Sequence, residues 1–340
     1  MLLFQEWHTS YSMFEVRQYT KEQVLEWDNF VQRSKQGTFL FNRTYMDYHA
    51  DRFLDCSLMV YRKGLLYALL PANKVDTTLY SHQGLTYGGL LTNTKACAED
   101  ICEVFLAINE YLNKQGFKHV VYKSIPWIYH KYPAEEDLYA LFNVCKARLT
   151  IRAISTTIPL LQHLKFTESR KSGIRKAIHS ELTIAESENM EAFWRILNDN
   201  LSNKYNAHPV HSLAELKLLK SRFPKSIRLF MSFNKVGNPL GGTLIFETPQ
   251  VIHTQYISAS PEGKSLGALD LLFDHLLNKV YADRKGYFDF GKSTEKNGRK
   301  LNAPLIFQKE GFGGRGVCYD CYEWDVMPME KLNNPVSKGK

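Results

Sequence analysis

The stretch VIHTQYISASPEGKSLGALDLLFDHLL, residues 251–277, decides which fold the sequence predicts. Its first part, residues 251–257, has the β-branched and aromatic composition of a strand. A segment that contains Gly263 and Gly267 follows, and the apolar periodicity after it predicts a helix. A strand, a glycine-containing loop and a helix N-terminus in this order favour an anion site, because free backbone N–H groups and the positive helix end point at the ligand.

Two polar side chains accompany these glycines. Lys264 would add a positive charge and Ser265 a hydroxyl donor to an anion site. An ordinary turn in which Ser265 caps the following helix explains the same residues equally well. The local sequence therefore leaves both interpretations open.

A second stretch, GYFDFGKS at residues 286–293, matches the pattern of the phosphate-binding loop of nucleotide hydrolases. The four variable positions of that loop must be free to surround a phosphate. Here they are Tyr287, Phe288, Asp289 and Phe290, an aromatic alternation that is typical of a strand. No apolar helical stripe follows Ser293. We therefore interpret the match as a coincidence and expect a strand.

The composition bounds the remaining possibilities. The chain has 340 residues, of which 44% are hydrophobic and 13% aromatic, and a net charge of +8. This length favours about two domains, and the charge favours an anionic partner. The first residues lack the pattern of a signal peptide and no apolar run is long enough to span a membrane, so a cytoplasmic protein is expected.

Six scattered cysteines predict free thiols, and Cys318 and Cys321 belong to a predicted strand that places them on opposite faces.

The predicted elements occur in a similar order twice. Each half has a helix, strands, a helix, a strand, a helix and a final strand, so the expected class is α/β (α+β). We place the first domain at residues 1–160, the second at 161–328 and a polar tail at 329–340. Within the first half, Thr20 and Gln23 predict a capping box at the start of a helix.

The order of parts in the second half resembles the GNAT acyltransferase core. Three further segments resemble the Fem-like branch, which has two GNAT-like domains in tandem. They are RKSGIRKA at 170–177, YFDFG at 287–291 and FQKEGFGGR at 307–315. The resemblance implies two tandem domains, each with a mixed, mostly antiparallel sheet flanked by helices.

The resemblance also implies a donor and an acceptor. Gly263, Gly267 and Ala268, with Lys264 and Ser265 between them, lie where the family's loop holds the pyrophosphate of acyl-coenzyme A. An acyl group, most simply acetyl, would pass from this donor to an amine on a sugar, a cell-envelope peptide or a polysaccharide precursor. The alternatives are aminoacyl transfer from tRNA to a peptidoglycan-type precursor, and a non-catalytic binding module. Peripheral contact with a membrane is compatible with these acceptors, whereas DNA and a metal ion are not expected.

Acyl transfer to an amine needs a base, an acid and a donor for the developing oxyanion. We predict Tyr256 as the acid and Glu295 as the base. Lys309, beside a glycine-rich segment, could neutralise a phosphate or an oxyanion, and the Fem-like resemblance implies that it lies in the active-site channel. His253 fits a core or surface histidine better than a site residue. The resemblance to GNAT enzymes also implies that the strands ending near residues 257 and 290 separate beyond residue 257.

The remaining predicted residues would bind the acceptor. They share a position at the end of a strand or beside glycines, and they are His82, Tyr87, Asp289, Ser293 and Arg315. The first two would line a cleft between the domains, and Arg315 would support the same anion as Lys309. The basic segment at 170–177 is a candidate tRNA contact, with a solvated helix face as the simpler explanation.

Overall fold

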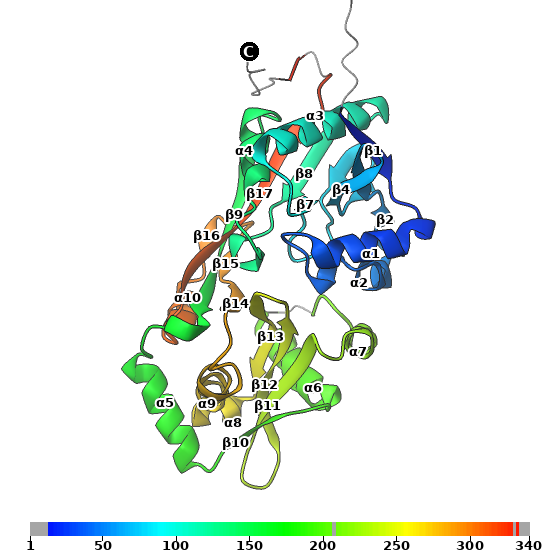
Figure 1. Cartoon of the computed structure of the whole chain (residues 1–340). Helices are drawn as coiled ribbons and strands as arrows, with labels where there is room; N and C mark the ends of the chain where they lie inside the picture. Colours follow the sequence, from blue (N-terminus) through cyan, green and yellow to red (C-terminus); the bar gives the residue numbers. More distant parts are fainter. Residues whose placement is uncertain (1–12, 206–208, 329–330, 333–340) are drawn as a thin grey trace, which may run out of the picture.

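The computed structural model describes residues 13–205, 209–328 and 331–332, which form two lobes joined by long strands (Figure 1). The N-terminal segment interpreted as lacking a signal peptide and most of the predicted tail lie outside these residues. The mixed α/β class is confirmed, with large sheets flanked by helices. No helix in the described part of the chain is long and apolar enough to cross a membrane.

The first lobe contains a four-stranded antiparallel sheet in the order β1-β3-β4-β7. The capping box predicted at Thr20 and Gln23 is present at the beginning of its first helical segment. Its strands and helices have the following bounds: β1 Phe14–Gln18, α1 Val24–Arg33, α2 Arg43–Met46, β2 Leu54–Asp55, β3 Leu58–Arg62, β4 Leu65–Leu70, β5 Asn73–Val75, β6 Thr78–Tyr80, β7 Leu91–Thr92, α3 Ala98–Lys114, β8 His119–Lys123 and α4 Glu136–Asn143.

The second lobe contains the strands that the opening stretch predicted. Its elements and those that return to the first lobe are β9 Arg148–Pro159, α5 Glu168–His179, β10 Thr183–Glu186, α6 Met190–Tyr205, α7 Leu213–Arg222, β11 Ile227–Phe233, β12 Pro239–Glu247, β13 Val251–Ala259, α8 Pro261–Leu266, α9 Ala268–His275, the π-helical turn Leu276–Val280, β14 Tyr287–Lys292, β15 Thr294–Glu295, β16 Lys300–Leu301, α10 Ala303–Glu310 and β17 Arg315–Asp325. The stretch that matched a phosphate-binding loop is thus strand β14, as expected.

One sheet runs through both lobes. Its strand order is β10-β11-β12-β13-β14-β9-β17-β8-β6-β5-β2. The last strand, β17, pairs with β9 along its length and also with β8 of the first lobe. The division of the chain at residue 160 remains a prediction, because hydrogen-bonded pairing is continuous across it. Cys318 is exposed and Cys321 buried on β17, and all six cysteines are free thiols, as predicted.

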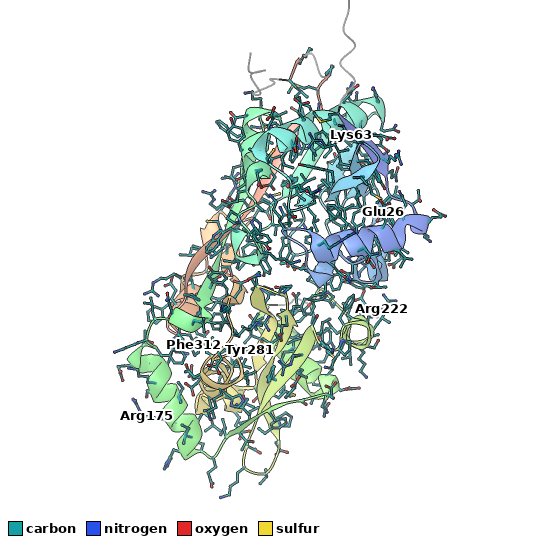
Figure 2. The ribbon with its side chains drawn as sticks, viewed as in Figure 1. Glu26, Lys63, Arg175, Arg222, Tyr281 and Phe312 are labelled. Atoms are coloured by element: carbon teal, nitrogen blue, oxygen red, sulfur yellow. The ribbon has the colours of Figure 1, made fainter. Side chains whose placement is uncertain are left out.

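A single aromatic-rich core cluster fixes the lobes against each other. The ring of Phe39 lies 5.2 Å from that of Phe223 and 5.5 Å from that of Phe246, and these two partners belong to the second lobe. Arg222, labelled in Figure 2, donates from Nη1 to the carbonyl oxygen of Thr44 at 2.7 Å. The surface at which the lobes meet is therefore a fixed part of the fold, and a site built there can draw side chains from both.

Candidate active site

Strands β13 and β14 separate at one position in the middle of the sheet. They pair in parallel through three residue pairs, the last of which is His253 with Asp289. Beyond this pair β13 stays with β12, with a bulge at Gln255, while β14 stays with β9. Gly291 turns β14 away with a φ of +74°, a conformation that favours glycine. The predicted separation is present, but it begins at residue 253 and not at 257, because the bulge and the turn come earlier than the sequence pattern suggested.

A cavity of about 560 Å³ opens where the strands part. The second lobe contributes His253, Gln255, Gly291, Lys292 and Lys309 to its lining. The first lobe contributes residues from α2, from the segment after it and from the glycine-rich loop after β6: Tyr45, Tyr48, His49, Arg52, Phe53, Gln83, Gly84, Leu85 and Thr86. The site is thus built at the meeting of the two lobes.

A second cavity, of about 330 Å³, continues on the other side of Lys309. Ile257, Phe290, Leu305 and Lys309 line both cavities, and most of the remaining lining of the second is apolar. The two cavities share a wall at Lys309. This arrangement offers separate spaces for two reactants on either side of one cation.

His253 and Asp289 form a hydrogen-bonded pair under the first cavity. Nδ1 of His253 lies 2.8 Å from Oδ2 of Asp289. Asp289 is fully buried, and its carboxylate also accepts hydrogen bonds from the hydroxyls of Ser155, Thr157 (3.0 Å) and Tyr319 (2.7 Å). Burial alone would raise the pKa of Asp289, but the hydrogen bonds, first among them that from His253, lower the pKa to about 2.

This pair defines the chemistry of the imidazole. An ionised carboxylate can only accept, so the proton of His253 lies on Nδ1. The other nitrogen, Nε2, is then an acceptor. A Cβ added at Gly291 would lie 3.4 Å from Cε1 of His253, 3.8 Å from the carbonyl oxygen of Thr254 and 4.0 Å from Nε2 of His253. The basic edge of the imidazole therefore faces the gap between the strands.

Lys309 is a buried cation next to this base. Its Nζ donates to the carbonyl oxygens of Gly291 (2.9 Å) and Lys292 (3.3 Å) and to Oγ of Ser293 (3.0 Å). Burial lowers the pKa of Lys309 to about 8, with the carboxylate of Asp289 opposing part of that shift. The lysine sits on α10 between the two cavities. Its role in the reaction remains a proposal.

Two predicted residues lie behind this lining. Asp289 supports His253 from below, and the fully buried Ser293 accepts the hydrogen bond from Lys309. Tyr256 does not line either of these two cavities, and its hydroxyl lies 2.7 Å from Nδ1 of His211. The predicted acid, Tyr256, is therefore not part of the cavity lining, although the preceding residue, Gln255, is.

Four predicted residues lie elsewhere. Glu295 projects from the hairpin of β15 and β16, where it pairs with Lys300 at 3.0 Å. Arg315 is exposed at the beginning of β17 and donates to its neighbour Gly314. His82 and Tyr87 are buried beneath the first-lobe wall, where they pack on other rings, and they do not contribute to the described lining. The sequence identified their segment but not the residues in it that face the cavity.

The expected glycine loop at 263–268 is wrong as a local structure. Residues Pro261–Leu266 form helix α8, capped by Ser260, whose Oγ accepts from the N–H of Gly263. The N–H groups of Lys264 and Gly267 also donate to backbone carbonyls. The glycines are required for close packing: a Cβ at Gly263 would lie 2.3 Å from the carbonyl oxygen of Leu240, and one at Gly267 2.4 Å from that of Gly173. Ser265 and Ala268 are helical residues of α8 and α9, and only Lys264 lines a cavity, the second one.

The comparisons with known proteins agree with this architecture. FemX superposes with a TM-score of 0.64 over 93% of this chain and 98% of its own, at 11% identity. The chain has a Fem-like fold. L-PGS from Bacillus licheniformis gives a TM-score of 0.56 at 12% identity, covering 89% of this chain and 91% of its own.

A third structure extends the same likeness. A C-terminal domain ascribed to a lysylphosphatidylglycerol synthetase of Agrobacterium fabrum gives a TM-score of 0.57 at 11% identity, with the same coverage, 89% and 91%. No family model matches the sequence, and no curated protein matches it. The likeness is therefore one of fold, and the described residues hold no group of three or more side chains suited to a metal ion.

Proposed function

We propose that this protein is an acyltransferase that moves an activated acyl or aminoacyl group to the amine of an acceptor. The observation that carries the proposal is the His253–Asp289 pair at the point where β13 and β14 separate. A base held in one tautomer, beside a cavity and next to a buried cation, supplies what the attack of an amine on a carbonyl requires.

The reaction follows from these positions. His253 Nε2 accepts the proton of the attacking amine as the C–N bond forms. The Lys309 ammonium stabilises the negative charge that develops on the carbonyl oxygen. The bond from the carbonyl carbon to the leaving sulfur or oxygen then breaks, and the imidazolium returns its proton to that leaving group. Direct attack needs no nucleophile from the protein.

The leading donor in this proposal is acyl-coenzyme A, with the second cavity as its place. That cavity is lined by apolar residues, with Lys264 and Asn200 among its few polar ones. An acetyl group on this donor and an amine on a sugar or cell-envelope precursor complete the reaction as first predicted. The backbone amides of residues 263–268 were predicted to bind the pyrophosphate of this donor, but they take part in helices and turns. A coenzyme A donor would therefore depend on side chains such as Lys264.

Aminoacyl-tRNA is the second candidate donor. The helical structure of the segment expected to bind pyrophosphate favours it. A site without a backbone cradle for pyrophosphate suits a donor whose phosphates are held elsewhere. The Fem-like fold is compatible with a donor of this kind, and α5 presents Arg175 at the outer end of the second lobe (Figure 2). Lys171 and Arg175 both lie near Glu168, which reduces the charge that this helix offers.

The test compares the two donors directly. The purified protein is incubated with a panel of amino sugars and amino acids and with either acetyl-coenzyme A or a mixture of charged tRNAs, each labelled in the acyl group. We expect label transfer to an amine from one donor in the wild type and its loss in His253→Ala. Absence of transfer from both donors, together with no change in melting temperature with either, would leave the binding-module alternative.

A further inference from the structure

The lining of the first cavity has an unbalanced charge. It contains three basic side chains, Arg52, Lys292 and Lys309, and among its described residues no aspartate or glutamate. The two nearby carboxylates have partners: Asp289 accepts from His253, and Glu215 pairs with Arg52. A cavity of this composition favours an anionic ligand and disfavours a cationic one.

Arg52 is the cation best placed to bind such a ligand on the side of the first lobe. Its Nη2 lies 2.6 Å from Oε1 of Glu215, and its side chain is 40% exposed. A guanidinium has five N–H donors in a planar fork, and a single carboxylate accepts from only some of them. The ring of Tyr48 lies under it, 5.8 Å from the guanidinium carbon. Arg52 is thus held in place while part of its donor set faces the cavity.

Neutral polar groups surround this cation. Burial lowers the pKa of His211 to about 4 and also lowers that of His49, so both imidazoles are uncharged at neutral pH. The rings of Tyr48 and His49 stack 4.2 Å apart. Gln83 adds a neutral amide to the lining, so this wall offers hydrogen bonds around a single positive charge.

Two polar atoms of lining residues lack a hydrogen-bond partner among the described residues: Oε1 of Gln255 and Nδ1 of His49. Oε1 of Gln255, on the bulge of β13, is buried and makes no hydrogen bond in the described structure. A buried acceptor without a donor costs about 1–3 kcal/mol, and a ligand hydroxyl or amine would satisfy it. The bulge therefore places an unsatisfied buried acceptor in the wall of a cavity whose lining already includes a base and several cations.

We propose that the acceptor is an amine that carries a phosphate or carboxylate group, and that Arg52 binds this anion while the amine reaches His253. The chemical class is a small anionic amine with hydroxyl groups, such as an amino-sugar phosphate or an acidic amino sugar. The inference rests on the proposed function only in naming the ligand as the acceptor. The anion site itself follows from the lining.

The experiment measures binding without a donor. Calorimetric titrations compare glucosamine 6-phosphate, muramic acid and glucosamine, which share the amine and differ in the anion. We expect one or both anionic sugars to bind at least 10-fold more tightly than glucosamine, and the preference between the two to show whether phosphate or carboxylate is recognised. Equal affinity for all three, or no binding by either anionic sugar at 10 mM, would overturn the proposal.

Three variants separate the role of Arg52 from that of its ion pair. Arg52→Gln should weaken binding of the preferred anion about 10- to 100-fold, in line with a charge-assisted hydrogen bond. Glu215→Gln frees the guanidinium and keeps an acceptor for the helix cap, so it should bind the anion as tightly as wild type or more tightly. Arg175→Gln, on the outer end of α5, is the control and should change nothing. If Glu215→Gln loses as much affinity as Arg52→Gln, Arg52 acts only by joining the lobes.

The failure of this inference is distinguishable from failure of the proposed function. His253→Ala should lower the rate of transfer at least about 100-fold and leave binding of the anionic sugar within about twofold, since the imidazole and the anion site are separate groups. Anion binding without transfer from any donor would retain the site and refute the enzyme. Transfer to neutral amines as fast as to anionic ones would support the enzyme and refute the role of the anion site in binding the acceptor.

Discussion

Nδ1 of His253 lies 2.8 Å from Oδ2 of Asp289, across the last residue pair that joins β13 to β14. The same two strands separate immediately beyond this pair. The sheet thus places a charged, fully buried carboxylate behind an imidazole whose other nitrogen faces the opening. Secondary structure, and not a flexible loop, fixes the geometry of the proposed base.

Replacement of His253 by alanine should lower the rate of transfer about 10²- to 10⁴-fold, which is the usual contribution of a general base. The loss should appear in kcat, because the imidazole acts on the proton of the amine. Steady-state kinetics with the identified donor and acceptor measure it. His163→Ala is the matched control, since His163 lines neither described cavity. A kcat that is the same in His253→Ala and wild type would contradict the assignment.

Lys309 predicts an upper limit to the active pH range. Because burial lowers its pKa to about 8, the ammonium loses its proton at pH values where an exposed lysine would keep it. The part of kcat that depends on this charge should fall above pH 8. In Lys309→Arg the guanidinium stays charged, so the decline above pH 8 should disappear even if the overall rate is lower. A pH–rate profile from pH 6 to 10 checks this, with Lys300→Arg as a surface control. Identical upper limbs in Lys309→Arg and wild type would assign the decline to another group.

Glu295→Gln should leave transfer within about twofold of wild type. The sequence placed this residue near the site as a base, but its carboxylate lies on the β15–β16 hairpin and binds Lys300 and the amide of Asn302. Removing an exposed ion pair of this kind changes stability by at most about 1 kcal/mol. A loss of kcat comparable with that of His253→Ala would restore Glu295 as the base and remove His253.

The sequence was sufficient for most strands and helices of the second lobe, though not for α8, because local periodicity is visible in one chain. The resemblance to the GNAT core predicted that β13 separates from β14, but not that the separation begins after His253. The sequence could not show which strands β17 pairs with, because its pairing with β8 of the first lobe depends on residues about two hundred positions away. The pairing of residue 253 with residue 289 is non-local in the same way, which is why Asp289 was predicted and His253 was not.

One local signal was available and was missed. Ser260 followed by Pro261 is a favourable start for a helix, with a capping hydroxyl and a proline in the first turn. That pattern begins α8 before the glycines that were interpreted as a loop. The glycines then serve close packing against β12 and α5, a demand that only the tertiary structure reveals.

Asp289→Asn should reduce stability in a pH-dependent way. The folded-state pKa of about 2 lies below the ordinary value of 3.8, so the carboxylate stabilises the fold above pH 4, and this contribution is lost as the pH falls toward 2. A shift of this size corresponds to about 2 kcal/mol. Urea unfolding between pH 2.5 and 6 should show the largest difference between wild type and Asp289→Asn at the upper end and a smaller one at the lower end. A difference that is constant over this range would show that the charge of Asp289 is not what stabilises the network.

Gly291→Ala tests whether the gap beside His253 must stay open. A Cβ at this position would lie 3.4 Å from Cε1 of His253, in contact but without a clash, while the φ of +74° costs a non-glycine residue about 1–2 kcal/mol. Gly237→Ala is the matched control, because Gly237 has a φ of +84° and no atom within 4 Å of an added Cβ. Both variants should lose a similar amount of stability in urea unfolding. Only Gly291→Ala should also lose transfer activity, by about tenfold or more, since its methyl group occupies the side of the imidazole that the attacking amine must reach. If both variants keep wild-type activity once folded, the amine does not approach through the gap between β13 and β14.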